Sequence, residues 1–173
     1  MIQEQIEDLK RLTQRYNDLS DKVKIDFKKE EGWSFGQILK HVMTVNETYF
    51  EVFDKLLAGS YKSPFLGRFS AIPNFVGNQI LASQEPSNAK KVTTFPVWEP
   101  RDVNHVTILQ DFEDHQALLI GYLKRLNESG LLKKNPVIRS PASNLVIYYL
   151  DMAIKIMIVH EKRHLKQAEE LKN

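Results

Sequence analysis

Apolar side chains recur at three- and four-residue steps in four long segments of this chain, which is the spacing that one face of an α-helix requires. In the first segment the apolar stripe runs from Ile6 to Val23, and the other faces carry charged and polar residues. The last segment is apolar on nearly all sides in its first half and charged in its second half. The pattern predicts four helices, over residues 2–23, 34–58, 104–129 and 145–172.

Short signals indicate where the second and third helices begin or end. Ser34 is followed three residues later by Gln37, which is the spacing of a capping box. In that motif the serine hydroxyl accepts from a backbone N–H, and the glutamine side chain returns to the cap. Gly59 and Gly130 follow the second and third segments, at the position where helices favour a left-handed residue.

Residues 60–102 form a long connection between the second and third helices, and no strand alternation is present there. A short helix after Pro73, within residues 69–83, is expected. A connection of this length lets the second and third helices run parallel, whereas short loops make neighbouring helices antiparallel. The expected fold class is therefore all-α, a single domain over residues 1–173 built as a four-helix bundle with a long crossover between helices 2 and 3.

Composition excludes several classes of function. Lys and Arg total 24 against 22 Asp and Glu, so the net charge of +2 gives no basic footprint for nucleic acid. Cysteine is absent, which rules out disulfides, thiolate metal sites and cysteine nucleophiles. The N-terminal residues are acidic, and the most apolar run, Leu145 to Val159, is too short and too charged to span a bilayer. We expect a cytoplasmic protein with no membrane or nucleic-acid partner.

Metal binding is indicated by the placement of three of the five histidines. His160 and His164 are four residues apart on the predicted fourth helix, so both imidazoles face the same way and can reach one ion. Both continue the inward apolar stripe of that helix, and His41 lies on the inward stripe of the second helix. If these helices pack together, three imidazoles converge and leave one coordination position of a divalent ion open for water or substrate.

A second interpretation of these histidines requires no metal. His41 would then be a hydrogen-bonded core residue, and His160 and His164 would form a partly exposed helix end. The two remaining histidines, His105 and His115, are expected at the surface or at helix ends.

Two stretches of the sequence carry a resemblance to a known family. The first is Trp33-Ser34-x-Gly36-Gln37-Ile38-Leu39-x-His41-Val42. The second runs from Asn135-Pro136-Val137 to Val159-His160-Glu161-x-x-His164-Leu165-x-Gln167. One histidine on the second helix is thus followed by an H-x-x-x-H pair near the C-terminus. In both motifs and in their order the chain resembles the DinB-like (DinB/YfiT) superfamily, whereas residues 60–102 match none of its motifs.

The resemblance implies a four-helix bundle of up-down-down-up topology that binds a divalent metal, nickel or zinc among the candidates, through His41, His160 and His164. It also implies a homodimer and a small-molecule substrate, with activity as a metal-dependent hydrolase or as a transferase that uses a low-molecular-weight thiol. The alternative is a non-catalytic structural or binding bundle with a vestigial metal site. Gln167, one turn beyond His164, is expected close enough to touch a bound group or a residue in the second shell of ligands. Glu161, about 100° around the helix from His160, is expected to be exposed.

Overall fold

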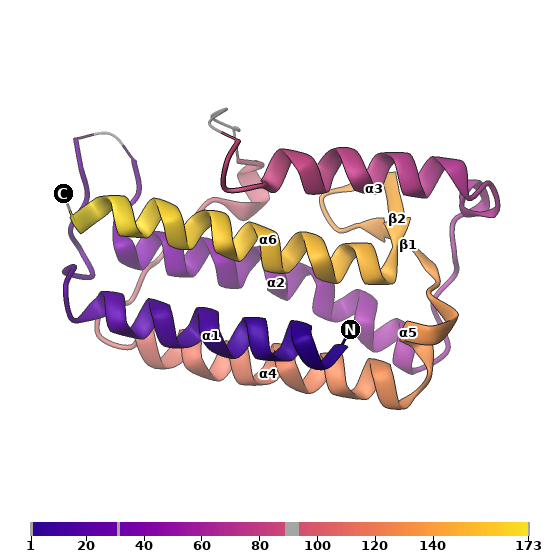
Figure 1. Cartoon of the computed structure of the whole chain (residues 1–173), viewed down its shortest axis with the longest axis horizontal. Coiled ribbons are helices and arrows are strands. Elements are labelled where there is room, and N and C mark those ends of the chain that lie inside the picture. The colour runs from indigo at the N-terminus through magenta and orange to yellow at the C-terminus, as the bar shows by residue number, and fades with distance from the viewer. Residues whose placement is uncertain (1, 31, 89–93, 173) are drawn as a thin grey trace.

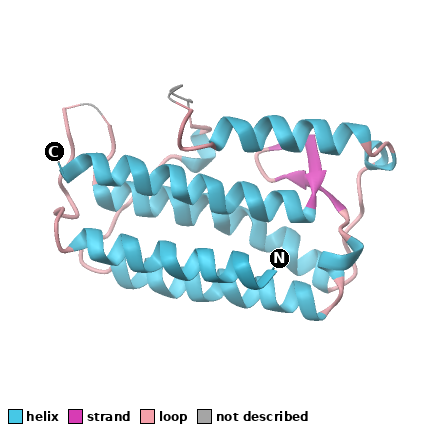
Figure 2. Ribbon diagram, in the orientation of Figure 1, coloured by secondary structure: helices cyan, strands magenta, loops and turns pink. Residues whose placement is uncertain are grey.

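The computed structural model describes residues 2–30, 32–88 and 94–172 of the chain. Within those ranges the protein is mostly helical and contains one small two-stranded sheet, as Figure 2 shows. The α-helices are α1 (Ile2–Ser20), α2 (Phe35–Leu57), α3 (Ala71–Gln84), α4 (Ile108–Glu128), α5 (Leu131–Lys134) and α6 (Leu150–Glu169). The 3₁₀ helices are η1 (Phe65–Arg68), η2 (Pro96–Trp98) and η3 (Glu170–Lys172), and the strands are β1 (Val137–Ser140) and β2 (Ser143–Tyr149).

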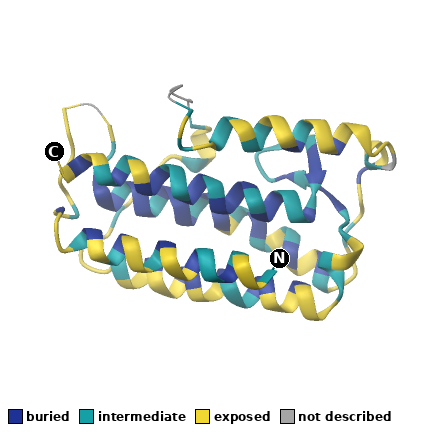
Figure 3. Ribbon diagram, in the orientation of Figure 1, coloured by how far each residue is buried: buried dark blue, intermediate teal, exposed yellow. Residues whose placement is uncertain are grey.

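Four long helices, α1, α2, α4 and α6, lie side by side and enclose the core (Figure 1). Both α1 and α2 pack against α4 and α6. In Figure 1, α1 and α6 run in one direction and α2 and α4 run in the other. The two long helices joined by the crossover are therefore parallel. Their inward faces are buried, as Figure 3 shows.

The capping box at the start of α2 is confirmed. The Ser34 hydroxyl accepts from the backbone N–H of Gln37 at 3.2 Å, and the Gln37 side-chain oxygen accepts from the backbone N–H of Ser34 at 2.9 Å. The two glycines after α2 and α4 are left-handed as expected, with φ of +69° at Gly59 and +75° at Gly130. The capping box fixes where α2 begins, and so fixes the position of His41 along it.

The prediction of a helix from residue 145 is wrong. Residues 143–149 form β2, which pairs antiparallel with β1, and α6 begins only at Leu150. The run Leu145 to Tyr149 is rich in β-branched and aromatic side chains, and a short apolar run of this kind does not distinguish a strand from a helix by its period. Pairing with β1 makes this run a strand. In that strand Ile147 and Tyr148 are buried, whereas Leu145 is 90% exposed. The purely all-α prediction is corrected by this hairpin.

The described part of the crossover contains the one helix that was expected and, in addition, the 3₁₀ helices η1 and η2. The short helix predicted within residues 69–83 is present as α3, and it packs along α6 and against β2. Gly77 allows α3 to lie this close to α6, because a Cβ at that position would be only 2.6 Å from the Cγ atom of Met152. Arg163 and Lys166 of α6 donate hydrogen bonds to backbone carbonyls of Ser83 and Pro86 at 2.8 and 3.1 Å. None of the helices in the described part of the chain is long and apolar enough to cross a lipid bilayer.

Candidate metal centre

The three histidines singled out from the sequence meet between α2 and α6. The Nε2 atom of His160 lies 3.2 Å from Nε2 of His41 and 3.0 Å from Nε2 of His164. All three residues are buried, with exposed fractions of 3% for His41, 9% for His160 and 8% for His164. The alternative in which the pair forms a partly exposed helix end is therefore wrong, and the cluster has the geometry to hold a metal ion.

Two of the three rings are hydrogen-bonded through the nitrogen that points away from the cluster, and these bonds set which nitrogen carries the proton. The Nδ1–H of His41 donates to the backbone carbonyl of Trp98 at 2.7 Å, and that of His164 donates to the side-chain oxygen of Gln167 at 2.8 Å. Because an oxygen of this kind can only accept, Nδ1 carries the proton in both rings. Each neutral ring then presents an unprotonated Nε2, which is the form that ligates a metal.

The spacing of the nitrogens tests whether an ion fits. In a tetrahedral zinc site with Zn–N bonds of about 2.0–2.1 Å, two ligand nitrogens are separated by about 3.3 Å. The observed separations of 3.0 and 3.2 Å are close to this value. Without a cation, His160 can donate one proton to only one of the two lone pairs that face its Nε2. Its Nδ1 is buried and has no hydrogen-bond partner among the described residues. The donor set therefore fits a divalent ion.

The electrostatics of the cluster keep the rings neutral. Burial lowers the pKa of all three histidines, to about 3 for His164 and well below the usual value for His160. The charges that act further on His160 and His164 are those of the neighbouring histidines and of the Arg163 guanidinium. No carboxylate of the described residues contributes to these shifts. The site is thus a set of nitrogen donors that are neutral near pH 7.

Two tryptophans contact the cluster, Trp33 through its ring and Trp98 through its backbone carbonyl, and sequence reasoning assigned neither of them a place at the site. The Trp33 ring lies 4.6 Å from the His41 ring and 6.0 Å from the His164 ring, nearly parallel to the latter at 21°. Trp98 supplies the carbonyl that holds His41, and it comes from the crossover. Gln167 contacts the site through His164, whose Nδ1–H donates to its side-chain oxygen, and its reach to a bound group stays a prediction.

The prediction that Glu161 is exposed is wrong. Its side chain is fully buried and accepts hydrogen bonds from Asn46 of α2 at 2.8 Å and from Gln116 of α4 at 3.1 Å. Burial raises its pKa to about 7, against the lowering effect of these two bonds. The hydroxyl of Tyr16 donates to the backbone carbonyl of the same residue at 2.9 Å. Glu161 therefore ties α6 to α1, α2 and α4.

The other two histidines lie apart from the cluster. His105 is exposed, as expected. His115 is buried on α4, contrary to the expectation that it lies at the surface, and its ring stacks on Phe50 at 5.4 Å. Burial, followed by the nearby charge of Lys40, lowers the pKa of His115 to about 4. The spacing of Phe112, His115 and Leu119 was the signal that sequence reasoning missed, because steps of three and four residues place His115 on the buried face of α4.

Comparison with known proteins identifies no relative. No protein-family model, curated protein or solved structure matches the chain.

Proposed function

We propose that this protein binds a divalent metal, zinc or nickel, through His41, His160 and His164, and that it is a DinB-like protein with an up-down-down-up bundle. The observation that carries the proposal is the convergence of three Nε2 atoms whose rings are neutral, buried and, in two cases, oriented by an acceptor on Nδ1. A divalent ion held by three imidazoles retains an open position and supplies Lewis acidity to a ligand bound there.

The residues around the histidines have separate roles in this proposal. Gln167 and the Trp98 carbonyl hold two of the rings in the tautomer that a metal requires. Trp33 covers the His41 and His164 rings and limits the access of water to them. The carbonyl comes from the crossover, so the conformation of that segment bears directly on the ligand geometry.

Within this proposal, transfer of a low-molecular-weight thiol is favoured over hydrolysis of a small-molecule substrate. Hydrolysis by a metalloenzyme commonly uses a carboxylate as the general base, and the closest candidate in sequence, Glu161, is committed to Asn46 and Gln116. A thiol needs less help to ionise, since its unperturbed pKa is about 8.5 whereas that of bulk water is about 15.7. With Glu161 committed to other hydrogen bonds, the site suits a thiol substrate, which ionises near neutral pH without a protein base.

A second candidate function is a structural metal site in a non-catalytic bundle. It is favoured by the burial of the three rings, since none is more than 9% exposed. In this reading the ion joins α2 to α6 and contributes to folding rather than to a reaction.

The decisive experiment is metal analysis by elemental mass spectrometry on protein purified without a histidine tag. Wild type should contain about one equivalent of zinc or nickel per chain, and His160→Ala should contain almost none. His105→Ala is the matched control, because it removes an exposed histidine outside the cluster and should leave the metal content unchanged. Wild-type protein that takes up no metal after dialysis against zinc and nickel would overturn the proposal.

A second experiment separates the catalytic from the structural reading. The metal-loaded wild type is assayed with a panel of low-molecular-weight thiols and electrophilic acceptors, and then with ester and amide substrates. Thermal unfolding is measured before and after chelation. Thiol transfer that is lost in His41→Ala, with the fold retained, supports the transferase. Unfolding on chelation, with no turnover in either panel, supports the structural site.

A further inference from the structure

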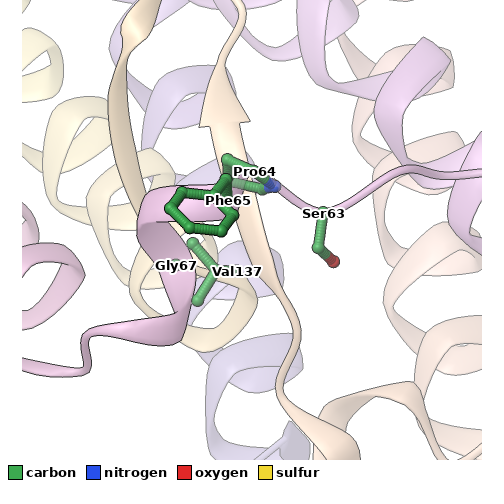
Figure 4. Close-up of a pocket in the computed structure, with 5 residues that line it drawn as sticks. All are labelled: Ser63, Pro64, Phe65, Gly67 and Val137. Atoms are coloured by element: carbon green, nitrogen blue, oxygen red, sulfur yellow. The ribbon is translucent and has the colours of Figure 1, made fainter.

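A pocket at the start of the crossover has no role in the proposed metal site. It has a volume of about 390 Å³ and lies between strand β1 and the segment that leads into η1. Figure 4 shows its lining residues, Ser63, Pro64, Phe65, Gly67 and Val137. Cavities that hold small organic ligands in proteins have volumes of about 300–1,000 Å³, so the pocket is large enough for one small molecule.

The pocket and the histidine cluster lie at different positions along α6. Val137 pairs with Tyr149, the residue directly before α6, whereas His160 lies in the second half of that helix. At a rise of about 1.5 Å per residue, the ten steps from Leu150 to His160 correspond to about 15 Å. Figure 1 likewise shows β1 beside the N-terminal end of α6. A small ligand in the pocket is therefore separate from the proposed metal.

Close packing makes the pocket part of the fold. A Cβ at Gly67 would lie 2.9 Å from the Cβ of Val137, so only glycine lets η1 lie this close to β1. The Tyr61 hydroxyl accepts from the backbone N–H of Arg139 at 2.8 Å, and Nη1 of Arg139 donates to the backbone carbonyl of Lys62 at 3.2 Å. These bonds hold the segment before the pocket on β1. A pocket fixed in this way loses little conformational entropy when a ligand binds.

The pocket has an apolar part and a charged edge. The Phe65 ring and the Val137 side chain lie close together in Figure 4 and form the apolar part. Arg139 is two residues after Val137 on β1, so both side chains leave the strand on the same face. The bond from Arg139 to the Lys62 carbonyl places the guanidinium beside the residue that precedes Ser63, at the edge of the lining.

The sequence around the pocket carries only positive charge. Residues 59–71 and 133–141, which lie within four positions of a lining residue, include five lysines and arginines and no aspartate or glutamate. None of the ion pairs between described residues involves Arg139. A guanidinium offers five N–H donors in a planar fork that matches a carboxylate, and the Lys62 carbonyl occupies one of them. The edge of the pocket thus suits an anionic group.

We propose that this pocket binds a small amphipathic carboxylate, with its hydrocarbon body against Phe65 and Val137 and its carboxylate on the guanidinium of Arg139. The Phe65 ring offers a flat apolar surface on which an aromatic body can stack. The guanidinium distinguishes an acid from its neutral amide, because only the acid forms a charge-assisted pair with it. The proposal does not depend on the metal, since none of the three histidines lines the pocket.

The test is a titration of the full chain, dialysed against zinc, with phenylacetate, followed by the backbone amide signals in NMR spectra. Phenylacetate should shift the signals of residues 61–67 and 137–139 and saturate with a dissociation constant of about 1 mM or lower. Phenylacetamide is the matched neutral probe and should bind about 10-fold more weakly or worse. Shifts confined to the residues around the histidine cluster would assign the carboxylate to the metal and overturn the proposal.

Variants separate the charged edge from the apolar part. Arg139→Gln should weaken phenylacetate binding by about 10-fold or more and leave phenylacetamide binding unchanged, whereas Arg139→Lys keeps the charge and should recover most of the affinity. Phe65→Ala should weaken the binding of both probes alike. Arg11→Gln is the matched control, because it removes an exposed arginine of α1 that is outside the pocket, and it should have no effect.

Three results would overturn the proposal: no saturable shift in wild type, equal affinity for the acid and the amide, or unchanged phenylacetate affinity in a folded Arg139→Gln. Circular dichroism shows which variants fold, and the comparison of acid with amide on wild type decides the matter even where a variant does not fold. His160→Ala, which is expected to lose the metal, should bind phenylacetate as wild type does. Failure of the pocket and failure of the metal site are therefore distinguishable.

Discussion

Replacement of Gln167 by leucine tests how the histidine cluster is oriented. The side-chain oxygen of Gln167 accepts from Nδ1 of His164 at 2.8 Å, and leucine keeps the approximate size of the side chain but offers no acceptor. The imidazole is buried, so its Nδ1–H would lose its partner with little access to water. An unsatisfied buried donor costs about 1–3 kcal/mol. Loss of such an orienting partner typically weakens metal affinity about 10- to 100-fold, equivalent to about 1.4–2.7 kcal/mol.

The measurement is a competition titration of zinc, and separately of nickel, against a chromophoric chelator at pH 7.5. Gln167→Leu should raise the dissociation constant by the stated factor. Gln167→Glu keeps an acceptor at the same position and should stay within a few-fold of wild type. Gln110→Leu makes the same chemical change at an exposed position of α4 and should have no effect. If Gln167→Leu binds both metals as tightly as wild type, the inferred tautomer of His164 is incorrect.

Three further predictions concern the stability of the bundle. The pKa of His115 falls from 6.5 to about 4 on burial, so between these pH values the unfolded chain binds a proton that the folded chain does not. As pH falls from 6.5 to 4, wild type should therefore lose about 3 kcal/mol more unfolding free energy than His115→Leu in urea titrations. Gly77→Ala places a Cβ 2.6 Å from Met152 Cγ and should lower the free energy of unfolding by about 1–3 kcal/mol, whereas Gly121→Ala meets no atom within 4 Å and should raise it by about 0.5–1 kcal/mol. Ser34→Ala removes the cap of α2 and should cost about 1 kcal/mol by the same measurement.

Helix boundaries were predictable where a local signal marks them. The capping box at Ser34 and the left-handed glycines at Gly59 and Gly130 act through contacts within a few residues, so the sequence alone contains their cause. The strand over residues 143–149 was not predictable in this way. Its partner residues 137–140 lie across a turn, and the same apolar run reads equally well as the start of a buried helix until that pairing is known.

The candidate site shows the same division between local and distant causes. The four-residue spacing of His160 and His164 places both rings on one side of α6, and the inward stripe of α2 locates His41. Glu161 was expected in solvent because it lies about 100° around the helix from His160. That inference assumes a helix with one solvated side, whereas α6 is packed against α1, α2 and α3. The side of α6 on which Glu161 lies was thus predictable from the sequence, but the packing of other helices against that side was not.

The segment from His160 to His164 on α6 has the sequence H-E-x-x-H. Its glutamate, Glu161, is buried and has a different role here from the one that this motif usually indicates. In zinc proteases with this motif the glutamate is the general base, which requires it to face the same open site as the metal. Here Asn46 and Gln116 donate to its two oxygens from α2 and α4, and Tyr16 of α1 holds its backbone carbonyl. Glu161 adjoins His160, and Asn46 lies little more than one turn beyond His41 on α2. The bond between Glu161 and Asn46 therefore fixes the register of α6 on α2 close to the point where the two histidines must meet. The glutamate therefore aligns the two helices that carry the three histidines.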